Sequence, residues 1–346
     1  MDDLIPEVES PDAIVPGLEG FTRNQIIWQK GKLIGSGSFG RVYYGVNLTT
    51  HELMAVKQTE LVPLNVRSSQ SLRNRNQKLL EALQVEISLL KELDHPNVVS
   101  YLGFDVNINT VSVFLEYVDG GSLASILSKF GKFPYPMTQS FTWQILHGLE
   151  YLHERFIIHR DIKGANILVT HHGEVKIADF GISKKIDIKS VPNAQLSLQG
   201  TLYWMAPEVM QNTGVGYTSK VDIWSLGCVV YEMLEGHHPW SGMSDVSIMV
   251  NVGREHKAPV LSADIALSEN EKAAVNEFLG LCFTADPEKR PTASNLFGYK
   301  FLDFTIPDEL GFDFEQWLDV KTKEKEAMEA IMEEDSDFYD SSEVEE

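Results

Sequence analysis

The sequence contains only two cysteines among its 346 residues, Cys228 and Cys282, which stand far apart and outside any metal-ligand spacing. Both are therefore expected to be buried free thiols in a reducing compartment, rather than parts of a disulfide framework or a zinc site. The chain has no run of about 18 apolar residues, so a membrane span is not expected. Its first residues lack the basic and apolar regions of a secretory signal, and a cytoplasmic location is predicted.

Basic residues are also scarce, because 29 lysines and arginines stand against 50 aspartates and glutamates, giving a net charge of -21. The acidic excess is concentrated at the ends, with six acidic residues within 1–24 and 17 within 303–346. Such a charge argues against nonspecific binding to nucleic acids or anionic membranes. Residues 1–26, which include several prolines, are predicted to form a linker, and residues 303–346 an acidic, partly disordered tail.

Short β-branched and aromatic runs separated by turn residues predict antiparallel strands at residues 27–34, 41–46, 52–57, 98–104 and 111–117. A helix is predicted among them at residues 74–93, from apolar residues at helical spacing, namely Leu79, Leu83, Ile87 and Leu90. Beyond Gly120 and Gly121, helical periodicity dominates, at residues 123–129, 137–155, 220–235 and 269–284. The predicted fold class is α+β, with a small β-rich lobe that has one main helix and a larger helical lobe.

A glycine-rich segment follows the first predicted strand and leads to Val42; it reads Gly35-Ser36-Gly37-Ser38-Phe39-Gly40. Glycines let backbone N–H groups approach phosphate oxygens, because no Cβ stands in the way. A similar spacing occurs in dinucleotide-binding turns, but those lead directly into a helix, and here a Val-Tyr-Tyr run typical of a strand follows. The segment therefore predicts a phosphate-binding turn between two strands.

Lys57 lies at the end of the next strand, where a cation would bind the α- and β-phosphates of a nucleotide. A lysine at a strand end is usually a solvated edge charge, and only the spacing after the glycine-rich segment changes that interpretation. Such a lysine needs an anion to hold it, and Glu86 is the best candidate because it lies mid-helix beside the apolar positions. Glu81 and Glu92 are the alternatives and are expected to face solvent.

The most specific pattern is His159-Arg160-Asp161-Ile162-Lys163-Gly164-Ala165-Asn166, with Asp179-Phe180-Gly181 following it. Phosphoryl transfer requires positioning and charge neutralisation more than covalent chemistry. Asp161 is predicted to accept the proton of the substrate hydroxyl, and Lys163 to lie near the transferred γ-phosphate. Asn166 and Asp179 are predicted to hold Mg²⁺, which prefers oxygen ligands.

The polar stretch between Asp179 and Glu208 is typical of a mobile loop. Arg160 would be buried near like charges without an anionic partner, which a phosphate on this loop would supply. Ser197 is the first candidate acceptor and Ser190 the second, and the alternative is that both are ordinary loop serines. Thr201 is expected to hydrogen-bond the pair of Asp161 and Lys163 and to favour serine or threonine substrates.

Two structural roles are also predicted within the helical lobe. Asp222 is expected to brace the backbone of the 159–166 segment from within a helix. Glu208 and Arg290 are expected to form a buried ion pair, because either charge alone would be costly there.

Across residues 27–302 the chain resembles the protein kinase superfamily, in which every one of these motifs recurs. Residues 200–209, 222–228, 238–240 and 95–103, and the spacing from Lys57 to Glu86, are similar to the STE-type MAP kinase kinase kinases, in particular to the fungal cell-wall-integrity type. The resemblance implies a serine/threonine kinase that uses ATP and Mg²⁺ and phosphorylates a MAP kinase kinase in a signalling cascade. STE20-like and p21-activated kinases remain the alternative subgroup, and a pseudokinase scaffold is disfavoured because no catalytic residue is missing.

The same resemblance implies a bilobal fold with a small lobe at 27–115, a hinge at 116–121 and a helical lobe at 122–302. Leu115 would be the gatekeeper, and an upstream kinase or autophosphorylation would activate the loop. The adenine would lie between the two lobes, where Glu116 and Val118 would offer hinge backbone groups to it. The ring would lie against Ile34, Val42, Ala55 and Leu168.

The acidic end carries four aromatic residues, Phe304, Phe312, Phe314 and Trp317, which we expect to dock on the helical lobe. Within the same segment, a short helix is predicted at residues 321–332. The acidic run that follows is expected to be disordered.

Overall fold

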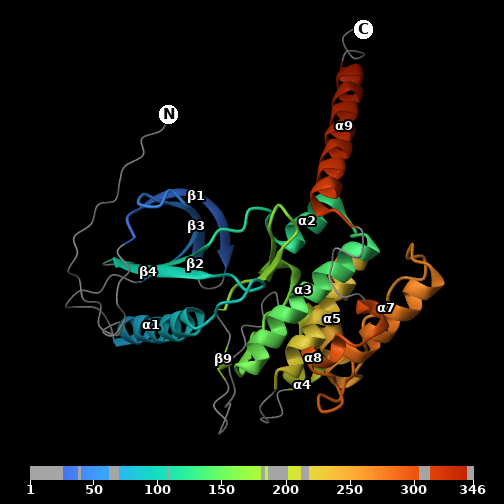
Figure 1. Ribbon diagram of the computed structural model, residues 1–346, viewed down its shortest axis with the longest axis horizontal. Coiled ribbons are helices and arrows are strands. Elements are labelled where there is room, and N and C mark those ends of the chain that lie inside the picture. Colours follow the sequence, from blue (N-terminus) through green and yellow to red (C-terminus); the bar gives the residue numbers. More distant parts are fainter. Residues whose placement is uncertain are drawn as a thin grey trace.

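The computed structural model describes residues 26–37, 40–61, 70–107, 109–180, 184–185, 202–211, 218–303 and 312–340. Several expectations fall outside these residues, namely those for Ser38, Phe39, Ser190, Ser197, Thr201, Phe304 and nearly all of the 1–26 linker. Within them the chain forms a small lobe built on a sheet and a larger helical lobe (Figure 1). The predicted α+β, two-lobed fold is confirmed.

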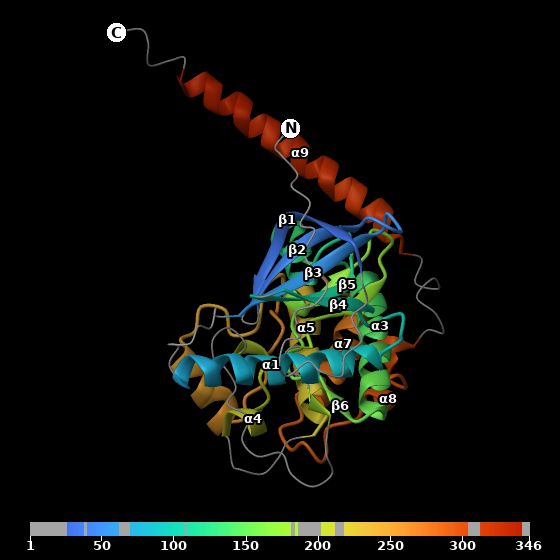
Figure 2. The ribbon, with the colours of Figure 1, turned by 90° about the vertical axis from the view of Figure 1, so that its left-hand side faces the viewer.

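The small lobe is an antiparallel sheet in the order β1-β2-β3-β5-β4, crossed by one helix, α1, that runs beneath it in Figure 2. Helix α1 buries the apolar side chains at the predicted helical spacing, Leu83, Ile87 and Leu90, because they fall on one face. The bounds are β1 (Trp28–Gly37), β2 (Gly40–Asn47), β3 (Leu53–Glu60), α1 (Gln70–Lys91), β4 (Tyr101–Asn107) and β5 (Thr110–Glu116).

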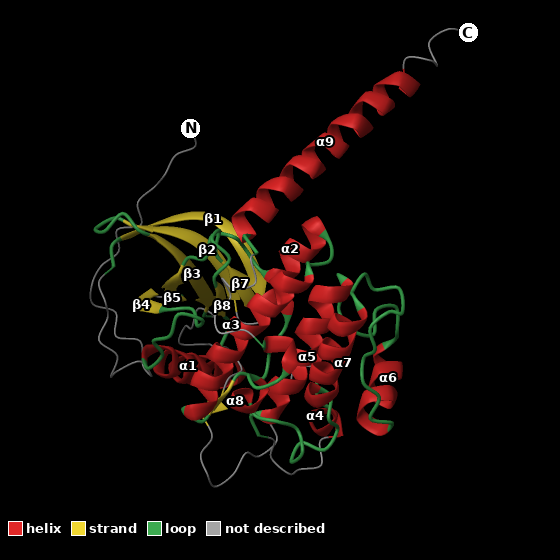
Figure 3. Cartoon of the chain, turned by 45° about the vertical axis from the view of Figure 1, so that its right-hand side comes forward, coloured by secondary structure: helices red, strands yellow, loops and turns green. Residues whose placement is uncertain are grey.

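Helices dominate the larger lobe (Figure 3), where α5 lies at the centre of the core and buries Trp224 completely. The segment predicted as residues 220–235 coincides with α5, which ends where Gly236 adopts a left-handed φ of 79°. The helices are α2 (Leu123–Phe130), α3 (Tyr135–Glu154), α4 (Pro207–Gln211), α5 (Lys220–Glu235), α6 (Asp245–Ile248), α7 (Glu269–Cys282), α8 (Ala293–Leu296) and α9 (Phe314–Asp340). The remaining elements are β6 (Ile157–Ile158), η1 (Gly164–Asn166), β7 (Ile167–Val169), β8 (Val175–Ile177), β9 (Lys184–Lys185), η2 (Leu202–Trp204), η3 (Met249–Arg254) and η4 (Lys300–Leu302).

The C-terminal helix differs from its prediction. Helix α9 begins at Phe314 and ends at Asp340, so it is longer than the predicted 321–332 and includes part of the run expected to be disordered. Its start is fixed by Asp313, which accepts hydrogen bonds from the backbone N–H groups of Gln316 and Trp317, and ion pairs such as Lys323–Asp319 follow along it. Figure 1 shows α9 projecting away from the rest of the molecule.

Both cysteines are buried free thiols, as predicted, and burial raises the pKa of each well above its ordinary value. Among the helices that the structure describes, none combines the length and the apolar character needed to cross a bilayer.

Candidate active site

A buried cluster of charge links the sheet, α1 and the segment after β8. Lys57 on β3 places its Nζ 2.7 Å from Oε1 of Glu86 on α1 and 2.8 Å from Oδ1 of Asp179. Burial lowers the pKa of Lys57, but the charges of Glu86 and Asp179 outweigh it and hold the pKa above its ordinary value. The lysine is therefore a fixed cation, and Glu86 rather than Glu81 or Glu92 lies beside it, since those two are exposed.

A second cluster forms on the segment between β6 and β7. Lys163 Nζ lies 2.7 Å and 2.9 Å from the two carboxylate oxygens of Asp161. Asn166, on the short helix η1, donates its amide to the backbone oxygen and to Oδ2 of Asp161, both at 2.8 Å. The three side chains thus hold one another in a fixed arrangement, with the Asp161 carboxylate at its centre.

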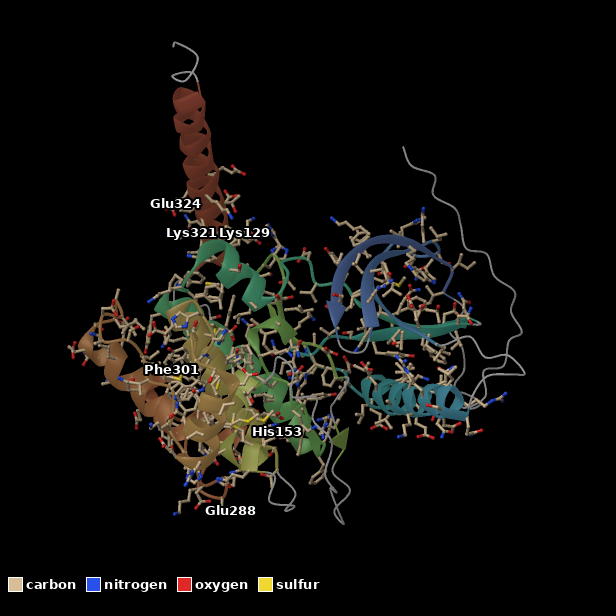
Figure 4. All side chains as sticks on the ribbon, turned by 180° about the vertical axis from the view of Figure 1, so that it is seen from behind. Lys129, His153, Glu288, Phe301, Lys321 and Glu324 are labelled. Carbon is tan, nitrogen blue, oxygen red and sulfur yellow. The ribbon has the colours of Figure 1, made fainter. Side chains whose placement is uncertain are left out.

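Asp222 on α5 holds the backbone of the segment between β6 and β7, as predicted. Its carboxylate accepts the backbone N–H of His159 at 2.9 Å and that of Arg160 at 2.8 Å. The His153 ring on α3 lies 2.9 Å from the same carboxylate, a contact that the sequence did not predict (His153 is labelled in Figure 4). Burial raises the pKa of Asp222, but the contacts with His153 and the backbone hold it below the ordinary value, so the carboxylate stays charged.

The backbone is strained at this site. Arg160 has a φ of 68° and Asp179 a φ of 64°, a left-handed conformation that non-glycine residues rarely adopt. Such conformations persist where surrounding contacts over-determine them. Here the carboxylate of Asp222 fixes the N–H of Arg160, and the Nζ of Lys57 fixes the carboxylate of Asp179.

Glu232 on α5 is a buried carboxylate that sequence reasoning missed. Its Oε2 accepts the backbone N–H of Gly164 at 3.2 Å and the indole N–H of Trp204 at 3.0 Å. A Cβ on Gly164 would lie 2.7 Å from Oε1 of this carboxylate, so a larger residue there would displace the Glu232 side chain. Glu232 therefore ties the segment of Asp161 to the η2 turn, and the signal for it would have been an acidic residue within an otherwise apolar helix.

The glycine-rich segment lies at the tip of the β1–β2 hairpin, where Gly37 is opposite Gly40. Gly40 has a φ of 145°, and a Cβ there would lie 2.2 Å from the backbone oxygen of Gln58. Ser36 at the tip is exposed and Gly35 is partly so. Val42 is opposite Lys57 in the pairing of β2 with β3, so the strand that begins at Gly40 lies beside the strand that supplies the lysine.

The residues expected around an adenine lie on both lobes. Ala55 on β3 is opposite Leu115 on β5 and is partly buried, while Val118 is 7% exposed and Ile34 on β1 is 40% exposed. Leu168 comes from β7 in the larger lobe. The bridge between Leu168 and Ser122 places Leu168 beside the hinge.

Glu116 carries a contact that was not predicted. Its carboxylate pairs with Lys176 on β8 at 2.8 Å and accepts the backbone N–H of Ser100 at 3.1 Å. The side chain therefore ties the end of β5 to β8, the strand that leads to Asp179.

The predicted ion pair between Glu208 and Arg290 is present. The guanidinium is completely buried and contacts both carboxylate oxygens, at 2.7 Å and 3.1 Å. This bidentate pair fixes α4 against the base of the helical lobe.

The site offers oxygen donors of the kind that Mg²⁺ prefers. Asn166 uses its amide N–H groups on Asp161 and so presents its oxygen, and the side chain of Asp179 is 39% exposed. The backbone N–H of Ala178 donates to the backbone oxygen of Asn166 at 2.9 Å, which holds the two donors close together. Asn166 and Asp179 thus offer two oxygen donors to a cation. Among the described residues no group of three His, Cys, Asp or Glu side chains could hold a metal.

The family model for the protein kinase domain matches residues 28–302. One relative is the MAP kinase kinase kinase mkh1 of Schizosaccharomyces pombe, which is 42% identical over 86% of this chain and 26% of its own length. A second is the serine/threonine-protein kinase BCK1/SLK1/SSP31 of Saccharomyces cerevisiae, which is 45% identical over 80% of this chain and 18% of its own length. A third is the mitogen-activated protein kinase kinase kinase 2 of Arabidopsis thaliana, which is 42% identical over 85% of this chain and 43% of its own length. The chain spans less than half the length of each. The family match and the two charged clusters agree, and the chain belongs to the protein kinase family.

Proposed function

We propose that the chain is an ATP-dependent serine/threonine protein kinase. The observation that carries the proposal is the joint assembly of the Lys57–Glu86–Asp179 cluster and the Asp161–Lys163–Asn166 cluster. Asp161 orients the acceptor hydroxyl and takes its proton, while Lys163 places a positive charge beside the developing negative charge. When bound, ATP supplies the phosphoryl group and Mg²⁺ neutralises the phosphate oxygens; Asn166 and Asp179 would hold the cation.

The remaining residues have positioning roles in this proposal. The backbone of the glycine-rich segment, with Ser38 and Phe39, contacts the phosphates, and Lys57 binds the α- and β-phosphates. The backbone of Glu116 and Val118 in the hinge (residues 116–121) bonds the adenine. The ring lies against the apolar side chains of Ile34, Val42, Ala55 and Leu168.

We further propose that the substrate is a MAP kinase kinase and that the protein acts in the cytoplasm. The names of the Schizosaccharomyces pombe and Arabidopsis thaliana relatives, both MAP kinase kinase kinases, support this substrate class. An upstream kinase or autophosphorylation would act on the loop that contains Ser190 and Ser197. Nucleic acid is not among the proposed partners, because the net charge is -21.

The substrate is tested with purified protein, Mg-ATP and a panel of catalytically inactive substrates: a MAP kinase kinase, a MAP kinase and a general basic protein. We expect the MAP kinase kinase to be phosphorylated most rapidly, on serine or threonine. Preference for another protein in the panel would contradict the substrate proposal while leaving the kinase proposal intact. Phosphotyrosine as the product would contradict both the residue specificity and the expected role of Thr201.

A further inference from the structure

Residues 312–318 lie outside the matched kinase domain, yet their aromatic side chains belong to its core. Phe314 is 5% exposed and packs against Phe141 of α3, with ring centroids 5.6 Å apart. Trp317 contacts Phe130 at 5.9 Å and Phe133 at 5.8 Å, at the end of α2. Figure 4 shows this base of α9, with Lys321 and Glu324, at the end of α2 that carries Lys129. We call the residues 312–318 the aromatic strap.

The aromatic strap also covers the turn between β7 and β8. Gly173 in this turn has a φ of 83°, and a Cβ there would lie 2.8 Å from Cβ of Phe314. The side chain of Glu315 pairs with His172, which precedes that glycine. From α3, Gln144 donates to the backbone oxygen of Gly173 at 3.1 Å and accepts the N–H of Val175 at 2.8 Å. The turn is therefore held between α3 and the strap.

The other side of the same hairpin rests on the hinge. The backbone N–H of His171 donates to Oδ1 of Asp119 at 2.8 Å, and the N–H of Val169 donates to the backbone oxygen of Gly121 at 2.9 Å. A Cβ on Gly120 would lie 2.4 Å from the oxygen of Val169, so the two backbones are in direct contact. Leu168, which forms a bridge with Ser122, comes directly before these contacts on β7. The hairpin that carries Leu168 is thus confined between the hinge and the strap.

We propose that Phe314 and Trp317 are positioning residues for the nucleotide: Trp317 stacks on Phe314, with ring centroids 6.0 Å apart, and Phe314 presses the β7–β8 hairpin against the hinge and so fixes the position of Leu168 beneath the adenine. The inference rests on the proposed nucleotide site, since Leu168 is expected to contact the ring. Loss of the strap leaves the charged clusters around Lys57 and Asp161 in place, because Glu86, Asp179, Lys163 and Asn166, which hold these two side chains, lie on other elements. Loss of the strap should therefore weaken nucleotide binding and leave the rate of phosphoryl transfer nearly unchanged.

The test uses the full chain with Phe314→Ala and Trp317→Ala, and measures the Kd of Mg-ADP together with KM for ATP and kcat. We expect both Kd and KM to rise about threefold to tenfold, as coupled contacts of this kind give, with kcat within about twofold of the unchanged protein. Gly173→Ala, which displaces Phe314 by the clash described above, should likewise raise Kd and KM and leave kcat nearly unchanged. Val320→Ala is the matched control on α9, because Val320 is 48% exposed.

Phe278→Leu controls for loss of stability alone, because Phe278 is fully buried and packs on Phe301 away from the hairpin. If Phe278→Leu lowers the melting temperature as much as Phe314→Ala and changes Kd equally, the strap has no specific role and the inference is wrong. An unchanged Kd in both strap variants would also overturn it. If the unchanged protein itself bound no Mg-ADP, the proposed function would fail instead, so the two failures are distinguishable.

Discussion

The buried carboxylate of Glu232 gives a prediction whose magnitude follows from its surroundings. Burial raises the pKa of Glu232 to about 6 from an ordinary 4.5, in spite of the hydrogen bonds from Trp204 and Gly164. This difference corresponds to about 2 kcal/mol between the protonated and ionised forms. Because the folded state binds this proton more tightly than the unfolded chain, protonation contributes stability that is complete below pH 4.5 and is lost as the pH rises through about 6.

Glu232→Gln removes this titration while keeping an oxygen that can accept the N–H of Trp204. We expect the stability of the variant relative to the unchanged protein to increase by about 2 kcal/mol between pH 4 and pH 7.5. The assay is urea denaturation followed by tryptophan fluorescence at half-unit pH steps. A stability difference that stays constant within about 0.5 kcal/mol over this range would refute the reasoning, because the carboxylate would then titrate alike in both states.

Glu235 on the same helix provides a control, because its pKa is shifted in the opposite direction. Burial raises its pKa, but the hydrogen bonds from Ser262 and the contact with Lys132 outweigh this and hold the pKa below the ordinary value. Its ionised form therefore contributes stability at neutral pH that is lost as the pH falls through the folded-state pKa. Glu235→Gln should accordingly lose stability relative to the unchanged protein as the pH rises, which is the reverse of Glu232→Gln.

Three further changes test the packing and charge described above. Glu208→Gln leaves the fully buried Arg290 without its anion and should lower the free energy of unfolding by about 3 kcal/mol in urea denaturation; an unchanged value would show that the pair is dispensable. Gly227→Ala places a Cβ 2.7 Å from that of Cys282 and should cost about 1–3 kcal/mol. Gly280→Ala on helix α7 meets no atom within 4 Å and should instead stabilise the protein by about 0.5–1 kcal/mol in the same experiment. Glu86→Gln should lower kcat/KM for ATP about tenfold or more by weakening the hold on Lys57, and the exposed Glu81→Gln should leave it unchanged.

Local patterns in the sequence predicted most of the fold because they match local structure. Helix α5 was predicted at its observed bounds, since a periodic apolar run ends at a glycine that takes the left-handed conformation. The prediction for β4 began too early, at residue 98 instead of Tyr101, because Val98 pairs with Ile177 in the other lobe instead of with β5. A β-branched run does not specify its partner, so only the tertiary structure separates these two cases.

The candidate site was predictable where function constrains sequence spacing and not where it arises from packing. The segment containing Asp161 and its relation to Asp222 were predicted, and the structure places both as expected. Glu232 and His153 were missed because their partners stand far away in sequence, although an acidic residue within an otherwise apolar helix was a local sign of Glu232. The docking of Phe314 and Trp317 was expected from their apolar surface, whereas the turn of β7–β8 that they cover was not.

The central claim is that Asp161 acts on the acceptor hydroxyl at a site assembled by Lys57 and Asp179. Its most direct test is a single-turnover measurement of phosphate transfer from Mg-ATP in the unchanged protein and in Asp161→Asn, with the Kd of Mg-ADP measured in parallel. The account predicts that the substitution lowers the transfer rate about 10²-fold or more, while the Kd stays within about twofold. Equal transfer rates in the two proteins would contradict the assignment of Asp161.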